Sequence, residues 1–145
     1  MMRVFRVWLE LFGIVMIAIA LAHLLFGQST YIGGGPVSAT MESDLRFYNV
    51  VFLAYGLAFI WAARDIPARA TAIQILGAVF FGGGLVRLLA WAVAGTPSWF
   101  YIAMIPVELI IPIGHHLVLR QLGMIGVGES TGRGGGSVST TAGSR

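Results

Sequence analysis

The distribution of apolar residues divides the chain into four long hydrophobic segments and one polar end. Each segment is close to the ~20 residues that an α-helix needs to cross the hydrocarbon core of a bilayer. The segments cover approximately residues 4–26, 45–63, 70–94 and 99–119. Apolar residues run through them without alternation, which favours helices over the strands of a barrel. We therefore predict an all-α, polytopic membrane protein with four transmembrane helices in an antiparallel bundle.

The connections between the segments carry ordinary signals for helix ends. Gly27 follows the first segment, and we expect Ser43 or Asp44 to cap the second. Pro67 separates the second segment from the third. The short turn at residues 95–97 then makes the third and fourth helices antiparallel neighbours.

The composition changes after residue 120, where glycine, serine and threonine come to dominate. Such a composition is typical of a disordered tail. Its glycines do not form a dinucleotide-binding fingerprint, because Gly126 and Gly128 lack a third glycine at the required spacing and no strand precedes them. We expect a transmembrane domain at residues 1–120 and a disordered cytoplasmic tail at residues 121–145.

Composition supports a lipid environment and excludes several classes of function. Of the 145 residues, 57% are apolar and 10% are charged, whereas soluble domains carry about 45–50% and about 25%. The absence of cysteine excludes disulfides, thiol catalysis and thiolate metal sites. The net charge of +3 comes from arginines scattered along the chain, so we expect no nucleic-acid partner.

The arginines predict the orientation in the membrane. If the helices alternate in direction, most arginines fall on the side of the two termini, and only Arg46 falls on the other side. The residues on the terminal side are Arg3, Arg6, Arg64, Arg69 and Arg120, with Arg133 and Arg145 in the tail. The positive-inside rule then predicts a multi-pass protein of the cytoplasmic (inner) membrane of a bacterium, with both termini in the cytoplasm. A cleaved signal peptide in the first segment is the alternative, but Glu10 within the segment and the apolar run to Phe26 weigh against it.

Ionisable residues within the segments are the main candidates for function, because a charge at depth is costly unless it is paired or hydrated. Glu10, Arg87 and Glu108 qualify. At ~1.5 Å per residue, Glu108 lies near the bilayer centre and Arg87 about 7 Å toward the outside. Helical side chains lean toward the helix N-terminus, so these two lean toward each other. We predict an Arg87–Glu108 ion pair, which either joins two helices or belongs to a ligand or proton site.

Further polar residues are expected near the outer surface. Arg46, Asp44 and His23 should lie at similar depth, with Arg87 able to reach toward them. They would form a polar vestibule above the ion pair. The alternative is that the acidic residues at the start of the second helix only balance its dipole.

Glu10 is expected at the depth of His115 and His116, toward the cytoplasmic side. Adjacent helical residues point about 100° apart, so at most one of the two histidines faces the bundle. A contact between that histidine and Glu10 is the expectation. His23 lies roughly 20 Å away in depth, so we expect no haem, no metal site and no other cofactor.

Several strings in the sequence resemble a known family. They are MESDLRFY at residues 41–48, FGGGLVRL at residues 81–88 and AGTP at residues 94–97, followed by Glu108. The chain resembles a family of small bacterial four-helix integral membrane proteins that is catalogued as a domain of unknown function and is distantly similar to DoxX-like membrane proteins. The resemblance covers about residues 5–120. It implies a helical membrane fold in which Arg46, Arg87 and Glu108 match polar positions of the family, and it implies no reaction.

These observations predict an integral membrane protein whose Arg/Glu cluster binds a small lipophilic or anionic ligand. The candidate residues are Arg87, Glu108, Arg46, Asp44, Glu10 and His23, and none of them is assigned a catalytic or metal-binding role. One alternative is an accessory or scaffolding subunit, with a membrane-protein partner or a second copy of the chain. The other is a membrane-embedded enzyme in which Glu108 or Glu10 acts as a general acid or base.

Overall fold

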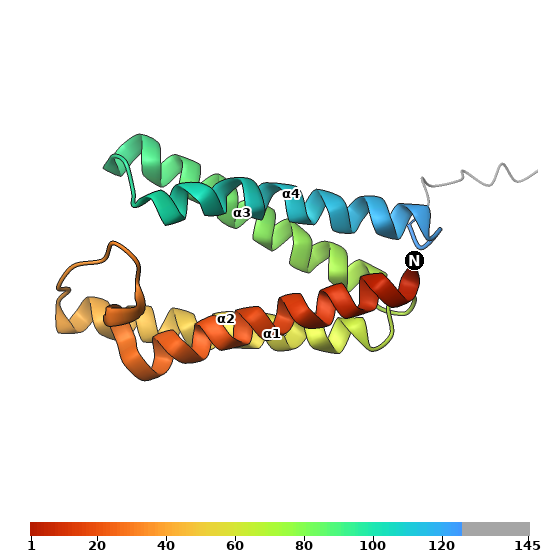
Figure 1. The fold of residues 1–145 in the computed structure, drawn as a ribbon, viewed down its shortest axis with the longest axis horizontal. Helices are drawn as coiled ribbons and strands as arrows, with labels where there is room; N and C mark the ends of the chain where they lie inside the picture. The colour runs from red at the N-terminus through yellow and green to blue at the C-terminus, as the bar shows by residue number, and fades with distance from the viewer. Residues whose placement is uncertain (126–145) are drawn as a thin grey trace, which may run out of the picture.

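The computed structural model describes residues 1–125, which fold into helices joined by short connections (Figure 1). The elements are α1 (Met2–Phe26), the 3-10 helix η1 (Gly27–Thr30), α2 (Ala39–Ala63), α3 (Ala70–Ala94) and α4 (Trp99–Gln121). All four α-helices are long and apolar enough to cross a membrane. The predicted all-α fold with four membrane-spanning helices is confirmed.

The helices are arranged as two antiparallel pairs. α1 packs along α2 and α3 packs along α4, while α2 and α3 share a smaller contact. The pairs converge at the end that holds the N-terminus, the α2–α3 turn and the end of α4, and they diverge toward the opposite end (Figure 1). We call the first the terminus end. The second, which holds the loop at residues 27–38 and the turn at residues 95–98, is the loop end.

Two glycines set the distance between α1 and α2. A Cβ atom on Gly13 would lie 2.7 Å from the carbonyl oxygen of Gly56, and one on Gly56 would lie 2.9 Å from the carbonyl oxygen of Gly13. Both distances are shorter than real Cβ contacts, and in each case the neighbouring atom belongs to the backbone, so it could move only if the helix moved. The crossing therefore depends on the absence of side chains, as is typical of closely packed membrane helices.

The hydrophobic core lies toward the terminus end. Its largest fully buried side chains come one from each helix and are Leu9, Phe59, Ile73 and Leu119. Leu122, Met124 and Ile125, which follow α4, pack against this core. The folded part thus continues past residue 120, where we placed the domain boundary. Residues 126–145 of the predicted tail lie outside the described residues.

The second helix begins earlier than its apolar segment indicates. Ser38 is its N-cap, and the Ser38 hydroxyl accepts a hydrogen bond of 3.2 Å from the backbone N–H of Met41. The prediction that Ser43 or Asp44 caps this helix is wrong, because both lie inside α2. Residues 39–44, which precede the apolar segment, are polar or exposed. The predicted start is late because the hydrophobic pattern marks only the apolar part of a helix.

Close packing between α3 and α4 also uses glycines. A Cβ on Gly84 would lie 2.9 Å from Cδ2 of Leu109, and one on Gly77 would lie 3.5 Å from Cβ of Pro112. Gly82, by contrast, has no atom within 4 Å of its Cβ position among the described residues. A side chain would therefore crowd α4 at position 84, whereas at position 77 a Cβ would make an ordinary van der Waals contact.

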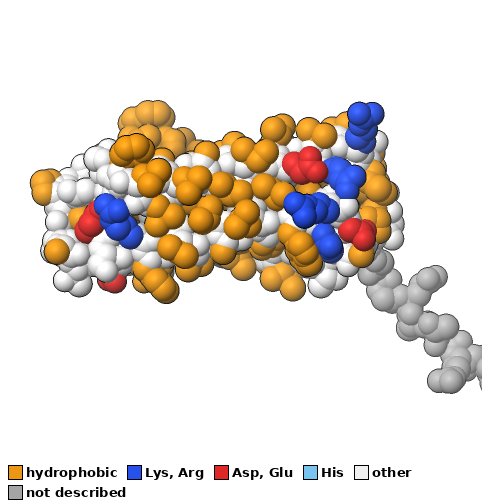
Figure 2. All heavy atoms as spheres, turned by 90° about the horizontal axis from the view of Figure 1, so that it is seen from below, with side chains coloured by type: hydrophobic (Ala, Val, Ile, Leu, Met, Phe, Trp, Pro, Cys, Tyr) orange, Lys and Arg blue, Asp and Glu red, His pale blue; other side chains and the backbone are white. Residues whose placement is uncertain are grey.

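The molecular surface is apolar between two charged ends. Figure 2 shows one face on which hydrophobic side chains cover the middle of the molecule, while the charged groups lie near the ends. Soluble monomers rarely expose such a continuous apolar surface. The pattern fits helices whose outer faces contact lipid.

Candidate functional site

Arg87 of α3 and Glu108 of α4 form the ion pair expected from their positions in the sequence. Nε of Arg87 lies 2.8 Å from both Oε1 and Oε2 of Glu108. The Glu108 side chain is 9% exposed and the Arg87 side chain is 38% exposed. The Glu108 carboxylate is thus buried between α3 and α4, while the Arg87 side chain is partly exposed.

Two glycines of α3 lie against Glu108. A Cβ on Gly83 would lie 4.0 Å from Oε2 of Glu108, and a Cβ on Gly84 would lie 3.2 Å from Cβ of Glu108. A larger residue at position 84 would push α4 away. These glycines precede Arg87 by about one turn, so the same stretch of α3 packs against Glu108 and supplies its cation.

A cavity of ≈ 270 Å³ opens beside the ion pair at the loop end. Its lining residues are Arg87, Ala90, Trp91, Ala94, Gly95, Thr96, Pro97 and Tyr101. The guanidinium carbon of Arg87 lies 5.2 Å from the ring centroid of Tyr101, within the range of a cation–π contact. Trp91 Nε1 donates a hydrogen bond of 3.3 Å to Thr96 Oγ1 across the rim.

The hydrogen bonds of Arg87 leave the end of its guanidinium unused. Both bonds to Glu108 come from Nε, and no hydrogen bond from Nη1 or Nη2 is present within residues 1–125. The terminal N–H groups form the planar fork that binds carboxylates and phosphates in bidentate fashion. Glu108 therefore binds Arg87 through Nε and leaves the terminal N–H groups without a hydrogen-bond partner among the described residues.

Arg46, Asp44 and His23 lie outside this cluster. Arg46 Nε donates a hydrogen bond of 2.9 Å to Oε1 of Glu42 one turn earlier, and Arg46 Nη1 donates one of 2.6 Å to the carbonyl of Leu24. These contacts belong to the α1–α2 pair. Asp44 is exposed on α2. Among the described residues, neither Arg46 nor Asp44 makes a hydrogen bond or an ion pair with Arg87.

His23 likewise stays within the α1–α2 pair. Its Nδ1 forms a hydrogen bond with Oγ1 of Thr30, and its ring stacks on Tyr31 with 4.0 Å between the centroids. Within the described residues, no direct contact joins His23 to Arg87, as the expected vestibule would require. The two helix pairs diverge at this end (Figure 1), which separates α1 and α2 from α3 and α4.

The expected contact between Glu10 and a histidine is wrong. Glu10 lies 3.8 Å from Nε of Arg6, on the same face of α1 one turn away. His115 instead accepts a hydrogen bond of 2.9 Å from Nε1 of Trp8. Position 8 lies on the side of α1 that faces α4, whereas position 10 is turned away from it. His115 is buried and His116 is exposed, which confirms that only one of the two histidines faces the bundle.

The family that this chain matches is described as Domain of unknown function (DUF4345), and the match covers residues 4–119. The chain belongs to the DUF4345 family. No curated protein and no solved structure matches it. The matched residues run from the start of α1 almost to the end of α4 and include the Arg87–Glu108 pair, so the candidate site lies within the DUF4345 domain. The expected likeness to DoxX-like proteins stays a prediction.

Three polar residues near the loop end of the DUF4345 domain were not among the candidates. Tyr101 forms a wall of the cavity. Asn49 of α2 is buried, and its Nδ2 donates a hydrogen bond of 2.7 Å to the hydroxyl of Tyr31. The only sequence signal for Asn49 is an amide within an apolar segment, and Tyr101 looks like an ordinary interfacial aromatic residue.

Proposed function

We propose that this DUF4345 protein binds a small lipophilic anion at the cavity beside Arg87. The observation that carries the proposal is the bonding of Arg87: its Nε is held by a buried carboxylate, its terminal nitrogens make no hydrogen bond within residues 1–125, and its side chain lines a cavity. An arginine that served only to join α3 to α4 would be expected to direct its fork at the carboxylate, because the bidentate geometry is the stronger one.

The size and lining of the cavity indicate what part of a ligand it holds. A volume of ≈ 270 Å³ is just below the range of about 300–1,000 Å³ that is typical of pockets for whole drug-sized ligands. It suits a carboxylate or phosphate group with a few attached carbons. Leu88 and Leu89 next to Arg87 are exposed, so an attached alkyl chain would continue along α3 among the lipid tails.

Binding of decanoate, compared with decanol, tests this proposal. Native mass spectrometry of the full chain released from nanodiscs should show bound decanoate but not the neutral alcohol of equal chain length. The double variant R87Q/E108Q retains a neutral hydrogen-bonding pair and should bind decanoate at least about tenfold more weakly, because a charged hydrogen bond is lost. The control R46Q removes another loop-end arginine that pairs with a glutamate and should bind as the wild type does. Equal binding by R87Q/E108Q and the wild type would refute the proposal.

The position of Glu108 favours binding over acid–base catalysis. Both of its oxygens lie 2.8 Å from Arg87, and its side chain is 9% exposed. A general acid or base must come within hydrogen-bonding distance of its substrate. Glu108 is better placed to orient Arg87 than to exchange a proton with a ligand in the cavity.

An accessory subunit is the second candidate function. Gly82 has open space beside it, and Leu85, Val86 and Leu89 on α3 are exposed. A small residue among exposed apolar ones is what a neighbouring membrane helix packs against. Because the chain has no cysteine, the variant G82C offers one crosslinking site. A specific crosslinked product in native membranes, absent from a control with V51C, an exposed position on α2, would support this function, and labelling by lipid-soluble reagents alone would oppose it.

We also propose that the terminus end faces the cytoplasm of a bacterial cell. Within residues 1–125, Arg3, Arg6, Arg64, Arg69 and Arg120 lie at or near this end, and cytoplasmic ends of membrane helices carry an excess of arginine and lysine. A membrane-impermeant maleimide should label the loop variant G35C in intact cells and the tail variant T140C only after permeabilisation. The reverse pattern would overturn this orientation.

A further inference from the structure

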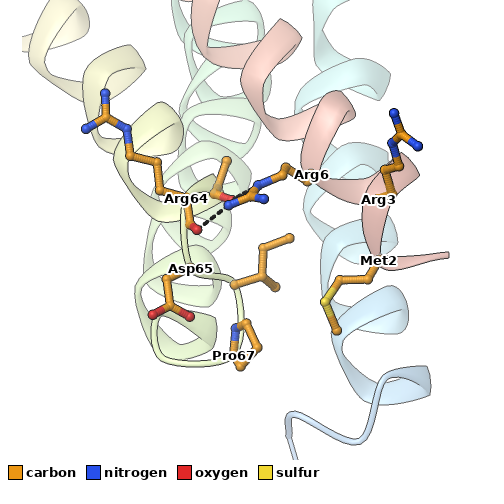
Figure 3. Close-up of a pocket in the computed structure, with 8 residues that line it drawn as sticks. Met2, Arg3, Arg6, Arg64, Asp65 and Pro67 are labelled. Carbon is orange, nitrogen blue, oxygen red and sulfur yellow. Dashed lines mark hydrogen bonds between the residues drawn. The ribbon is translucent and has the colours of Figure 1, made fainter.

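A second cavity, of ≈ 460 Å³, lies at the terminus end between the start of α1 and the α2–α3 turn. It is lined by Arg3, Arg6 and Arg64, with Asp65 as the acidic residue (Figure 3). Met2, Ile66 and Pro67 contribute apolar surface. Three arginines against one aspartate leave the lining with two excess positive charges.

Arg6 lines this cavity and is already hydrogen-bonded. Its Nε donates a hydrogen bond of 2.9 Å to the carbonyl of Ala63, and its Nη2 donates one to the carbonyl of Arg64. These are carbonyls at the C-terminal end of α2, where a helix dipole is negative and a cation is favourable. Figure 3 shows both hydrogen bonds crossing from α1 to α2. Arg6 therefore fixes the shape of the cavity.

Arg3 and Arg64 flank Arg6 on opposite sides (Figure 3). Within residues 1–125, neither side chain makes a hydrogen bond or an ion pair. Asp65 forms no ion pair with either of them among the described residues, and its Oδ1 accepts a hydrogen bond of 3.3 Å from the backbone N–H of Ala68. Arg3 and Arg64 thus line the cavity without a counter-charge, and their guanidinium groups are turned away from its centre in Figure 3, so each reaches a ligand there only after a change of rotamer.

The position of these arginines in the bilayer determines the ligand they meet. Arg3 is the second residue of α1, and Arg64 directly follows the last residue of α2. Since both helices are long enough to span the membrane, these residues lie at the depth of the lipid headgroups. Basic pockets between membrane helices at this depth bind anionic headgroups.

We propose that the terminus-end cavity binds the headgroup of an anionic phospholipid, with the exposed side chains of Arg3 and Arg64 rotating inward to bind its phosphate. Guanidinium groups bind phosphate oxygens through two N–H donors each. The apolar side chains of Met2, Ile66 and Pro67 would contact the glycerol and the first carbons of the acyl chains. This site is independent of the Arg87 cavity, because the two have no lining residue in common.

Native mass spectrometry with two lipids of identical acyl chains tests the proposal. The delipidated full chain is titrated with dioleoyl phosphatidylglycerol and, separately, with dioleoyl phosphatidylcholine. We expect the anionic lipid to bind more tightly. R64Q should weaken its binding about fivefold, since an arginine near an anionic lipid surface contributes about that factor, and R3Q/R64Q should weaken it further.

R120Q is the matched control. Arg120 is exposed near the same end and does not line the cavity, so R120Q should bind phosphatidylglycerol as the wild type does. If R64Q and R120Q lose the same affinity for phosphatidylglycerol, the proposal is overturned in favour of diffuse surface charge. Equal affinities of the wild type for the two lipids would also overturn it. Displacement of the lipid by millimolar inorganic phosphate would assign the cavity to free phosphate instead. Far-UV circular dichroism of each variant establishes that the helices are intact.

Discussion

Removing either partner of the Arg87–Glu108 pair should destabilise the protein by different amounts. In R87Q the buried carboxylate loses its cation, and loss of one partner of a buried ion pair costs about 3–5 kcal/mol. Because the Arg87 side chain is only partly buried, at 38% exposure, and lines the loop-end cavity, we expect the lower end of this range, about 3 kcal/mol. In E108Q the remaining guanidinium is the more exposed partner, so its cost should be smaller, about 1–2 kcal/mol.

The double variant R87Q/E108Q separates this interaction from other effects of the substitutions. Two amides can share a neutral hydrogen bond, so the double variant should be more stable than R87Q alone and less destabilised than the sum of the two single variants. The free energy of unfolding can be measured by titrating the protein in mixed micelles with sodium dodecyl sulfate while helix content is followed by circular dichroism. Additive effects, or a greater cost for E108Q than for R87Q, would refute the reasoning.

Three further predictions concern stability and use the same titration. G13A should destabilise the protein by about 1–3 kcal/mol, because its Cβ would lie 2.7 Å from a backbone oxygen. G114A has open space around its Cβ and should stabilise α4 by about 0.5–1 kcal/mol. Equal effects of the two substitutions would contradict the close crossing of α1 and α2. W8F should cost about 1–2 kcal/mol through loss of the hydrogen bond to His115, and an unchanged ring-nitrogen NMR signal of His115 would contradict that contact. S38A should cost about 1 kcal/mol by removing the N-cap of α2, and a loss below a few tenths would argue against that start of the helix.

The sequence was sufficient to predict the Arg87–Glu108 pair because depth and side-chain direction follow from the geometry of a single helix. The turn at residues 95–98 then makes α3 and α4 neighbours, so no further information about packing is needed. The same reasoning failed for Glu10, whose neighbours depend on how α1 is rotated against α4. Those helices are far apart in the sequence, and no local pattern determines that rotation.

The arrangement of the helices in two diverging pairs could not be predicted from the sequence either. Apolar residues surround each helix, so the pattern does not distinguish a lipid-facing side from a packed one. The contact between Gly13 and Gly56 is a case in point, because each glycine by itself is common in membrane helices. The separation of His23 and Arg46 from Arg87 follows from this arrangement.

An anion site at Arg87 can be tested directly through the response of the Arg87 side-chain nitrogens to an added anion. In protein labelled with nitrogen-15 arginine, NMR signals absent from R87Q/E108Q identify Arg87. Titration with decanoate should shift the Nη signals to saturation and leave the Nε signal unchanged, because Nε stays bound to Glu108. Unchanged Nη signals, or a shift confined to Nε, would contradict an anion site at the free end of this guanidinium.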